Sequence, residues 1–323
     1  MYEWQKQIQS IVDEIDQSII LHRDDALTLQ MLSKRLGYSE YYVTRKFREV
    51  SGMQLRSYLR CRKLAFALIE VRDSDRDLLD IAFDYGYSSH EAFTRAFKNL
   101  YGVSPSAYRK NPVPVVLRTK IQPFDRYFFG LGEIGMLKST EDVKMYFVTI
   151  PAHKFLHIRN YESIGYWDFW QKQSQIPGQD CETICGLLDS VKNKLDDEGG
   201  SEANSSSGHV MAYIFDPKGR VCEWGIPLCE CYGARLAENW QGAVPPQMLL
   251  TDIPEGEYLV FEHGPFDYDQ ENRSVEEKMD QAMASFDFEG SGYCYDNSPG
   301  RIFYFYHDPK RFWKYIRPVK KLS

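Results

Sequence analysis

The sequence predicts a multidomain protein with an all-α N-terminal domain followed by an α+β domain. Apolar residues recur at helical spacing through the N-terminal third, and strand signals are nearly absent before residue 112. From about residue 144, short runs rich in Val, Ile, Phe and Tyr alternate with Gly and Pro turns and with two helical stretches, 181–195 and 275–286. A chain of 323 residues exceeds one typical domain of about 100–200 residues. We expect domains at 1–112 and 144–323, joined by a linker over 113–143.

A repeat runs through the helical part. Gly37-Tyr38-Ser39 recurs as Gly86-Tyr87-Ser88, and each copy follows a short apolar helix, 29–36 in the first and 78–85 in the second. The glycine permits a left-handed turn, and a serine then caps the next helix, Ser39 in the first copy and Ser88 or Ser89 in the second. A helix, a short glycine turn and a capped helix together predict a helix-turn-helix unit, so the chain carries two.

The second helix of each unit is amphipathic. Val43, Phe47 and Val50 match Phe93, Phe97 and Leu100, and their spacing predicts that all six face the core. The residues left on the outer face are Tyr41, Thr44, Arg45 and Arg48 in the first helix and His90, Glu91, Thr94, Arg95 and Lys98 in the second. Arg bonds guanine edges and Thr contacts thymine methyl groups, so these residue types suit a DNA major groove. One such helix alone is as well explained by a solvated polar face, but two matching copies favour DNA binding.

Charge is unevenly distributed. The whole chain has a net charge of −7, whereas residues 1–112 carry 17 basic and 15 acidic residues. Residues 34–63 hold nine basic residues against only Glu40 and Glu49. A basic patch on an acidic protein is typical of a local nucleic-acid contact.

The repeat, together with residues 60–65 and 102–109, resembles the DNA-binding domain of the AraC/XylS family of transcription regulators. The resemblance implies two helix-turn-helix subdomains joined by a long helix, roughly 55–71, whose recognition helices enter successive major-groove segments. It implies base contacts from Tyr41, Thr44, Arg45, His90, Glu91, Thr94 and Arg95. We assign Lys46, Arg48 and Lys98 to phosphates. Arg60, Arg62 and Lys63 either assist them or form ion pairs with the Asp-rich stretch 73–84.

A second repeat lies in the C-terminal part. Residues 148–158 resemble 251–261, and residues 224–228 echo 315–319. Two copies of a strand, helix, strand, strand unit predict a pseudo-twofold domain with a cleft between the copies. Residues 258–266 and 315–321 resemble the GyrI-like effector-binding domain, and such a domain behind an AraC-type reader is the arrangement of Rob-like regulators.

Large aromatic side chains and two carboxylates are the candidates for binding a small aromatic or lipophilic effector. The predicted ligand-binding residues are Tyr166, Trp167, Trp170, Glu223, Trp224, Phe261, Glu262, Tyr304 and Trp313. Drug-sensing relatives place Glu in the last two strands, where this sequence has Tyr304 and Lys314, a departure that disfavours a cationic ligand. Glu223 and Glu262 are either carboxylate anchors or solvated strand residues, so a neutral or anionic ligand stays open.

Several function classes find little support. The chain begins without a signal peptide and has no apolar run of about 20 residues, so we expect a cytoplasmic protein with no membrane partner. The seven scattered cysteines predict reduced thiols, and we expect no metal and no cofactor. No nucleophile elbow or phosphate loop appears, so the protein is predicted not to be an enzyme. Two alternatives remain for the C-terminal domain: a hydrolase using Glu262 with Tyr304, or a protein-interaction module. The expected partners are double-stranded DNA and a small-molecule effector, and RNA polymerase is a further candidate.

Overall fold

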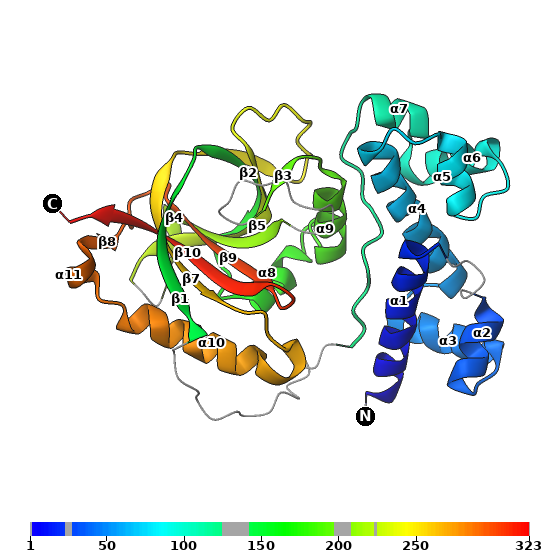
Figure 1. Cartoon of the computed structure of the whole chain (residues 1–323), viewed down its shortest axis with the longest axis horizontal. Coiled ribbons are helices and arrows are strands. Elements are labelled where there is room, and N and C mark those ends of the chain that lie inside the picture. Colours follow the sequence, from blue (N-terminus) through cyan, green and yellow to red (C-terminus); the bar gives the residue numbers. More distant parts are fainter. Residues whose placement is uncertain (1, 23–27, 125–141, 197–207, 223–224, 323) are drawn as a thin grey trace. The chain divides into compact units, whose positions relative to one another are not determined.

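The computed structural model describes residues 2–22, 28–124, 142–196, 208–222 and 225–322. The chain forms two compact units, Met1–Asp125 with Cys185–Ser190, and Arg126–Ile184 with Val191–Ser323. Helices build the first unit, and the second combines helices with one antiparallel sheet (Figure 1), which confirms the predicted fold class. Among the described residues, no helix combines the length and the apolar character that crossing a membrane requires.

The first unit contains two helix-turn-helix units and a long helix between them. Its helices are α1 (Glu3–Ile20), α2 (Leu29–Leu36), α3 (Glu40–Ser51), α4 (Leu55–Asp73), α5 (Leu78–Asp84), α6 (His90–Tyr101) and α7 (Pro105–Lys110). The helix predicted at 78–85 therefore ends one residue earlier, and the connecting helix extends two residues beyond the predicted range.

Glycine turns and serine caps create both helix-turn-helix units, as the repeat predicts. Gly37 and Gly86 adopt φ values of 73° and 81°, which side chains with a Cβ rarely adopt. Ser39 accepts a hydrogen bond from the backbone N–H of Tyr42, and Ser89 accepts one from Ala92. Ser89 is therefore the second cap, and Ser88 is not.

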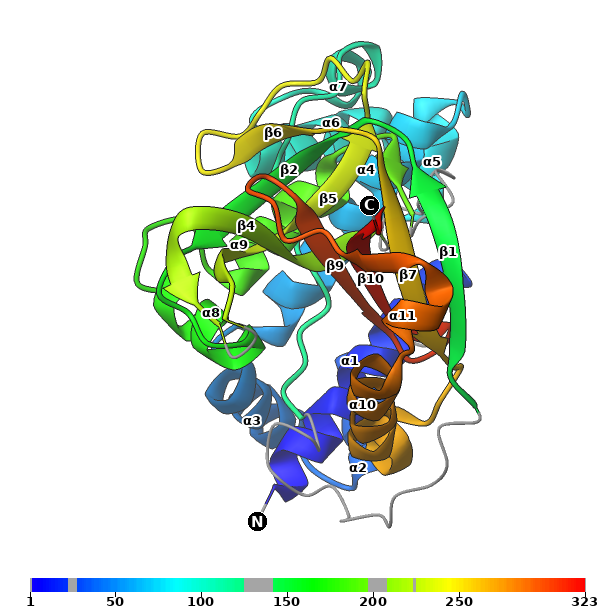
Figure 2. The ribbon, with the colours of Figure 1, turned by 90° about the vertical axis from the view of Figure 1, so that its left-hand side faces the viewer.

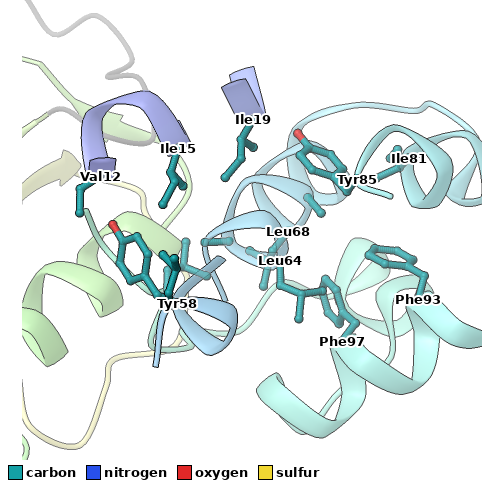
Figure 3. Packing of buried hydrophobic residues seen from close by; sticks show 14 of the residues in the cluster. Val12, Ile15, Ile19, Tyr58, Leu64, Leu68, Ile81, Tyr85, Phe93 and Phe97 are labelled. Atoms are coloured by element: carbon teal, nitrogen blue, oxygen red, sulfur yellow. The ribbon is translucent and has the colours of Figure 1, made fainter. Parts of the chain in front are cut away.

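One hydrophobic core joins the helices of this unit. Figure 3 shows side chains of α1, α4, α5 and α6 meeting around the middle of α4. Val43, Phe47, Phe93 and Phe97 are fully buried, as predicted. The expectation for Leu100 is wrong, because it is 41% exposed near the end of α6.

A buried ion pair fixes α4 to α1. Arg62 donates from Nε and Nη2 to the two carboxylate oxygens of Asp16, at 2.9 and 2.6 Å, and from Nη1 to the carbonyl of Arg118. The proposed pairing of Arg62 with the Asp-rich stretch is therefore wrong. Arg76, inside that stretch, instead bonds Glu70 and Asp84.

The first part of the expected linker packs on the helical unit. Residues 112–124 contain no helix or strand, yet Leu117 is buried and the N–H of Ile121 donates to the hydroxyl of Tyr58. Lys120 pairs with Asp13 of α1 at 2.5 Å. Residues 125–141 of the expected linker, and most of the polar loop expected at 196–208, lie outside the described residues.

The second unit is organised around one antiparallel sheet. Its strands are β1 (Lys144–Ile150), β2 (His153–Asn160), β3 (Lys194–Leu195), β4 (His209–Val221), β5 (Pro227–Ala237), β6 (Leu249–Ile253), β7 (Gly256–His263), β8 (Tyr293–Tyr295), β9 (Ile302–Asp308) and β10 (Phe312–Lys321). The strand order is β1-β7-β10-β9-β4-β5-β2-β6, while β3 pairs with β5 and β8 with β10.

The sheet closes into a ring. β1 continues into β2 through Pro151 and Ala152, and β6 continues into β7 through Pro254 and Glu255. These two long strands pair with each other along their whole length, β1 with β7 and β2 with β6. The register does not change between the two pairings: Ile150 lies opposite Gly256, and His153 lies opposite Ile253. The two ends of the strand order therefore meet, and the sheet curves round an inner face (Figure 2).

The ring has the predicted pseudo-twofold symmetry. The strands β1, β2, β4 and β5 of one half correspond to β6, β7, β9 and β10 of the other. If each strand is replaced by its counterpart, the same strand order results, now running in the opposite direction. Phe155 pairs with Arg235 in one half, and Tyr258 pairs with Pro318 in the other, so these two pairs occupy equivalent positions. The predicted echo of 224–228 in 315–319 is therefore wrong, since Pro318 corresponds to Arg235 and not to Pro227.

Helices cover the outer face of the sheet. They are α8 (Tyr166–Gln173), α10 (Tyr268–Ser285) and α11 (Phe288–Ser291), and α10 runs along one side of the sheet in Figure 1. Most of α9 (Cys181–Ser190) belongs to the first unit, where the carbonyl of Gly186 accepts from Leu117. The helix predicted to reach residue 195 ends at Ser190, before Asn193 takes a positive φ of 60°. α10 begins at Tyr268, seven residues before the predicted start, because Asp267 caps it.

We predict that Asp16→Asn destabilises the helical unit by about 3 kcal/mol, because it leaves the buried guanidinium of Arg62 without a counter-charge. Urea unfolding of the full chain, followed by circular dichroism, measures the change. Asp13→Asn is the matched control: its pair with Lys120 is half exposed, so we expect a loss below about 1 kcal/mol. Equal losses in the two variants would contradict a special role for the buried pair.

Candidate DNA interface and effector site

The two predicted recognition helices have the same pattern of exposure. From Tyr41 to Arg48 in α3 and from Glu91 to Lys98 in α6, every position falls in the same class of exposed, half-buried or buried. The exposed positions shared by the two helices are Tyr41, Arg45 and Arg48 in α3, and Glu91, Arg95 and Lys98 in α6. Two helices of different sequence thus present three side chains each at equivalent places.

In α3, Arg45 is accessible and only weakly held. Its side chain is 54% exposed, and Nε donates to Glu49 at 2.9 Å. An exposed pair of this kind is easily exchanged for another acceptor. Lys46 differs from the expected free phosphate contact, because it is half-buried, bonds Glu49 at 2.7 Å and lies over the ring of Trp4 in α1.

In α6, the polar residues divide into exposed and partly covered ones. Hydrogen bonds from its own backbone N–H and from the Ser89 hydroxyl lower the pKa of Glu91, so the carboxylate stays ionised and can accept from a cytosine amino group. Arg95 and Lys98 are exposed, and His90 is half-buried. The hydroxyl oxygen of Thr94 is buried and has no hydrogen-bond partner among the described residues. In this conformation the hydroxyl cannot contact a base in the DNA groove.

The helix α4 sets the separation of the two units. It packs against α3 near its start, where Tyr58 meets Phe47 at 5.5 Å between ring centroids, and against α5 and α7 further along. Its 19 residues span about 28 Å at 1.5 Å per residue. That length is of the order of one turn of DNA, about 34 Å, which separates successive major-groove segments on one side of the duplex.

The inner face of the ring holds one predicted carboxylate, and it is already paired. Glu262 accepts hydrogen bonds from Tyr146 at 2.8 Å and lies 3.0 Å from the buried ammonium of Lys314. Burial raises the pKa of Glu262, but the bonds from Lys314 and Tyr146 outweigh it and hold the pKa below its usual value. Lys314 thus neutralises the carboxylate that a cationic ligand would need.

A second polar cluster on the inner face joins the predicted Tyr304 to His153 and Arg235, which were not predicted. His153 accepts from the Tyr304 hydroxyl at 2.5 Å, because its other ring nitrogen donates to the carbonyl of Pro151. Burial, reinforced by Arg235, lowers the pKa of His153 to about 4, so the ring is neutral. The guanidinium of Arg235 lies 5.5 Å from the centroid of the Tyr304 ring. The signal that places Arg235 here is its period-two spacing from Cys229 and Cys231, both buried in the inner core.

The other predicted effector residues do not share this face. Phe261 and Trp313 belong to the core under α10, on the outer face of the sheet. Tyr166 and Trp167 are partly exposed on α8, and Trp170 packs on Tyr232. Glu223 and Trp224 lie outside the described residues. Of the predicted set, therefore, only Glu262 and Tyr304 are brought to the inner face within the part of the chain that is described.

No group of three or more His, Cys, Asp or Glu side chains in the described ranges is arranged to hold a metal ion. A surface pocket of about 430 Å³ lies beside the β6–β7 turn, between Glu255, Arg301 and Lys320. It shares none of the predicted site residues.

The helical unit defines the class: two capped helix-turn-helix units joined by one long helix are the fold of a DNA-binding protein. The sequence matches the family model described as a helix-turn-helix domain over residues 32–111. It is 39% identical over 105 residues to the regulatory protein SoxS of Escherichia coli K12, covering 32% of this chain and 94% of SoxS. It is 36% identical over 144 residues to the right origin-binding protein of E. coli K12, covering 45% of this chain and 43% of that protein.

The chain belongs to the AraC/XylS family of transcription regulators, and it is a DNA-binding regulator. Among solved structures, that of SAV2435 bound to tetraphenylphosphonium is similar to this chain with 15% sequence identity and a TM-score of 0.35. The similarity covers 55% of this chain and 94% of SAV2435. That likeness is too low to assign the second unit.

We predict that Lys314→Met lowers the thermal midpoint at pH 7 by roughly 5 °C, because Glu262 loses its buried counter-charge. The pKa of Glu262 is lowered in the folded protein, so the pair stabilises at neutral pH, and this contribution is lost as the pH falls through the carboxyl range. The midpoints of variant and parent should therefore converge only at a pH below the ordinary range of a glutamate pKa, where Glu262 becomes protonated in the folded parent. Lys144→Met, which removes an exposed partner of the same carboxylate, serves as control and should change little. A pH-independent deficit would show that packing, not charge, makes Lys314 important.

Proposed function

We propose that this regulator reads DNA with α3 and α6 together, and that a small-molecule effector bound on the inner face of the second unit alters its DNA affinity or its contact with RNA polymerase. The protein would act in the cytoplasm. The observation that carries the proposal is the equal exposure of α3 and α6, which gives each helix three accessible side chains at matching positions.

The two readers would contact different bases. Tyr41, Thr44 and Arg45 stand where α6 has Glu91, Thr94 and Arg95. The two arginines are candidates for guanine, and Glu91 favours cytosine. Arg48 and Lys98 are exposed at matching positions and would bond phosphates, which adds affinity that depends on salt.

The effector half of the proposal is supported by polar groups inside the ring that a purely structural core does not need. An effector changes DNA binding only if its affinity differs between two states of the protein. A buried polar group without a full set of hydrogen bonds destabilises the folded protein. A ligand that supplies the missing hydrogen bonds recovers that free energy when it binds.

A hydrolase that uses Glu262 with Tyr304 finds no support in the geometry. Glu262 is bonded to Lys314 and Tyr146, and Tyr304 donates to His153. The two proposed acid–base partners thus have their hydrogen bonds elsewhere.

We predict that Arg45→Ala and Arg95→Ala each weaken specific DNA binding by about 10-fold or more, the loss of one good base contact. Electrophoretic mobility shifts of the full chain on its own upstream DNA, over a salt series, measure the effect. Arg273→Ala, an exposed change of the same charge on α10, should leave binding within twofold. Binding that is salt-sensitive but equal in all three variants would show that α3 and α6 do not read bases.

We predict that Thr94→Val keeps specific binding within about threefold, since the buried hydroxyl reaches no base and the methyl that contacts thymine is retained. The unfolding midpoint should hold or rise, because a buried hydroxyl without a partner is removed. The same assay tests Thr94→Val beside Arg95→Ala. A loss as large as that of Arg95→Ala would mean that the hydroxyl turns outward on DNA.

A further inference from the structure

Arg235 is the buried side chain whose surroundings are least explained by folding. It is 1% exposed and projects from β5 to the inner face. Neither Nε nor Nη1 has a hydrogen-bond acceptor among the described residues. An ionised group in such a position costs the folded state several kcal/mol unless something pairs with it.

The groups around Arg235 are neutral. Tyr304 and Tyr258 are phenols whose pKa burial raises, the latter to about 12, and His153 is uncharged. Asp296, whose charge acts on Tyr258, is itself bonded to Arg301 at 2.8 Å and to Ser298. The structure therefore supplies no carboxylate for the guanidinium within its described part.

A second unused donor lies in the same core. The Tyr258 hydroxyl is buried and has no partner among the described residues. Tyr258 and Tyr304 are buried in the same inner core, and the Arg235 guanidinium lies 5.5 Å from the centroid of the Tyr304 ring. The charge of Arg235 lowers the pKa of both phenols, which agrees with this placement. Two guanidinium nitrogens and one hydroxyl thus offer donors and lack an acceptor.

Aromatic rings extend from this cluster along the inner face. Ring centroids of Tyr304 and Tyr306 are 6.5 Å apart, those of Tyr306 and Phe312 are 6.4 Å apart, and Phe312 carries the Lys314 ammonium at 4.2 Å. Lys314 is matched by Glu262, so among the described residues the unmatched positive charge of the buried inner face is that of Arg235. The environment suits a flat molecule with one negative group.

We propose that Arg235 and the Tyr258 hydroxyl form an anion-binding site that anchors the carboxylate of a small planar aromatic acid. The carboxylate accepts from Nε and Nη1 of Arg235, a charge-assisted pair that is among the strongest in proteins. Side chains fill the inner face, so the acid enters by displacing neighbouring rings, and a small planar molecule requires the least displacement. This inference rests on the proposed effector role of the second unit and specifies its ligand class.

Three probes of matched shape and different charge test the proposal: benzoate, benzamide and benzamidine. The thermal midpoint of the full chain is measured with each at constant ionic strength, and titration calorimetry gives the affinity. We expect benzoate alone to raise the midpoint in a saturable manner. Arg235→Met should abolish the benzoate response while folding at least as stably without ligand, since it replaces an unpaired buried charge with an apolar chain.

Tyr258→Phe is the second variant, and it removes one donor while keeping the ring. Its benzoate affinity should fall by about 3- to 10-fold, as for one lost hydrogen bond. The proposal is overturned if Arg235→Met keeps the benzoate response, if the three probes act alike, or if none acts. Inorganic phosphate is the fourth probe. A rise of the midpoint with phosphate but not with benzoate, lost in Arg235→Met, would assign the site to a free anion and overturn the proposal of an aromatic acid.

The test separates this inference from the broader effector role. If benzamide or benzamidine stabilises the protein and shifts its DNA affinity while benzoate does neither, the effector role stands and the anion site fails. If benzoate binds through Arg235 but leaves DNA affinity and transcription in vitro unchanged, the site stands and its regulatory role fails.

Discussion

The reading of DNA by this protein depends on one mechanical constraint, the fixed position of α4. Two readers in one chain gain from each other only if the distance between them is set before DNA arrives, because otherwise binding must also order the chain. α4 is fixed along its length by the shared core and by the buried pair of Arg62 with Asp16. The same guanidinium also bonds the carbonyl of Arg118, so it ties the segment after α7 to the two helices.

The second unit obeys a different constraint, closure of its sheet. Closure leaves most strands hydrogen-bonded on both sides and forces one face of every strand inward. Apolar residues meet that demand at most inward positions, and polar ones stand at a few. Water does not reach these inward positions, so each polar side chain there needs a hydrogen-bond partner from the protein or from a ligand. Glu262 has partners in the protein, and we infer that Arg235 takes its partner from a ligand.

The local structure of the helical unit is predictable from the sequence. Gly37 and Ser39 act through neighbours a few residues away, so a repeated pattern was enough to place α2, α3, α5 and α6. Prediction from the sequence fails where contacts are distant. The sequence leaves Arg62 either to assist the phosphate contacts or to pair with the nearby acidic stretch, but Arg62 bonds Asp16, 46 positions earlier. The sequence analysis assigns both Phe261 and Glu262 to the effector site, although adjacent strand residues must face opposite sides of the sheet. The alternation of Cys229, Cys231 and Arg235 held the missed signal, but only pairing with Phe155 shows which side is inner.

The twofold symmetry of the ring is a symmetry of backbone and not of chemistry. At equivalent pairs of positions one half carries Phe155 with Arg235, and the other carries Tyr258 with Pro318. A symmetric chamber would accept a guest in two orientations of equal energy. Here Arg235 has only Pro318 at the equivalent place, so the inner face distinguishes the two orientations, and a guest with one negative group would have one preferred orientation.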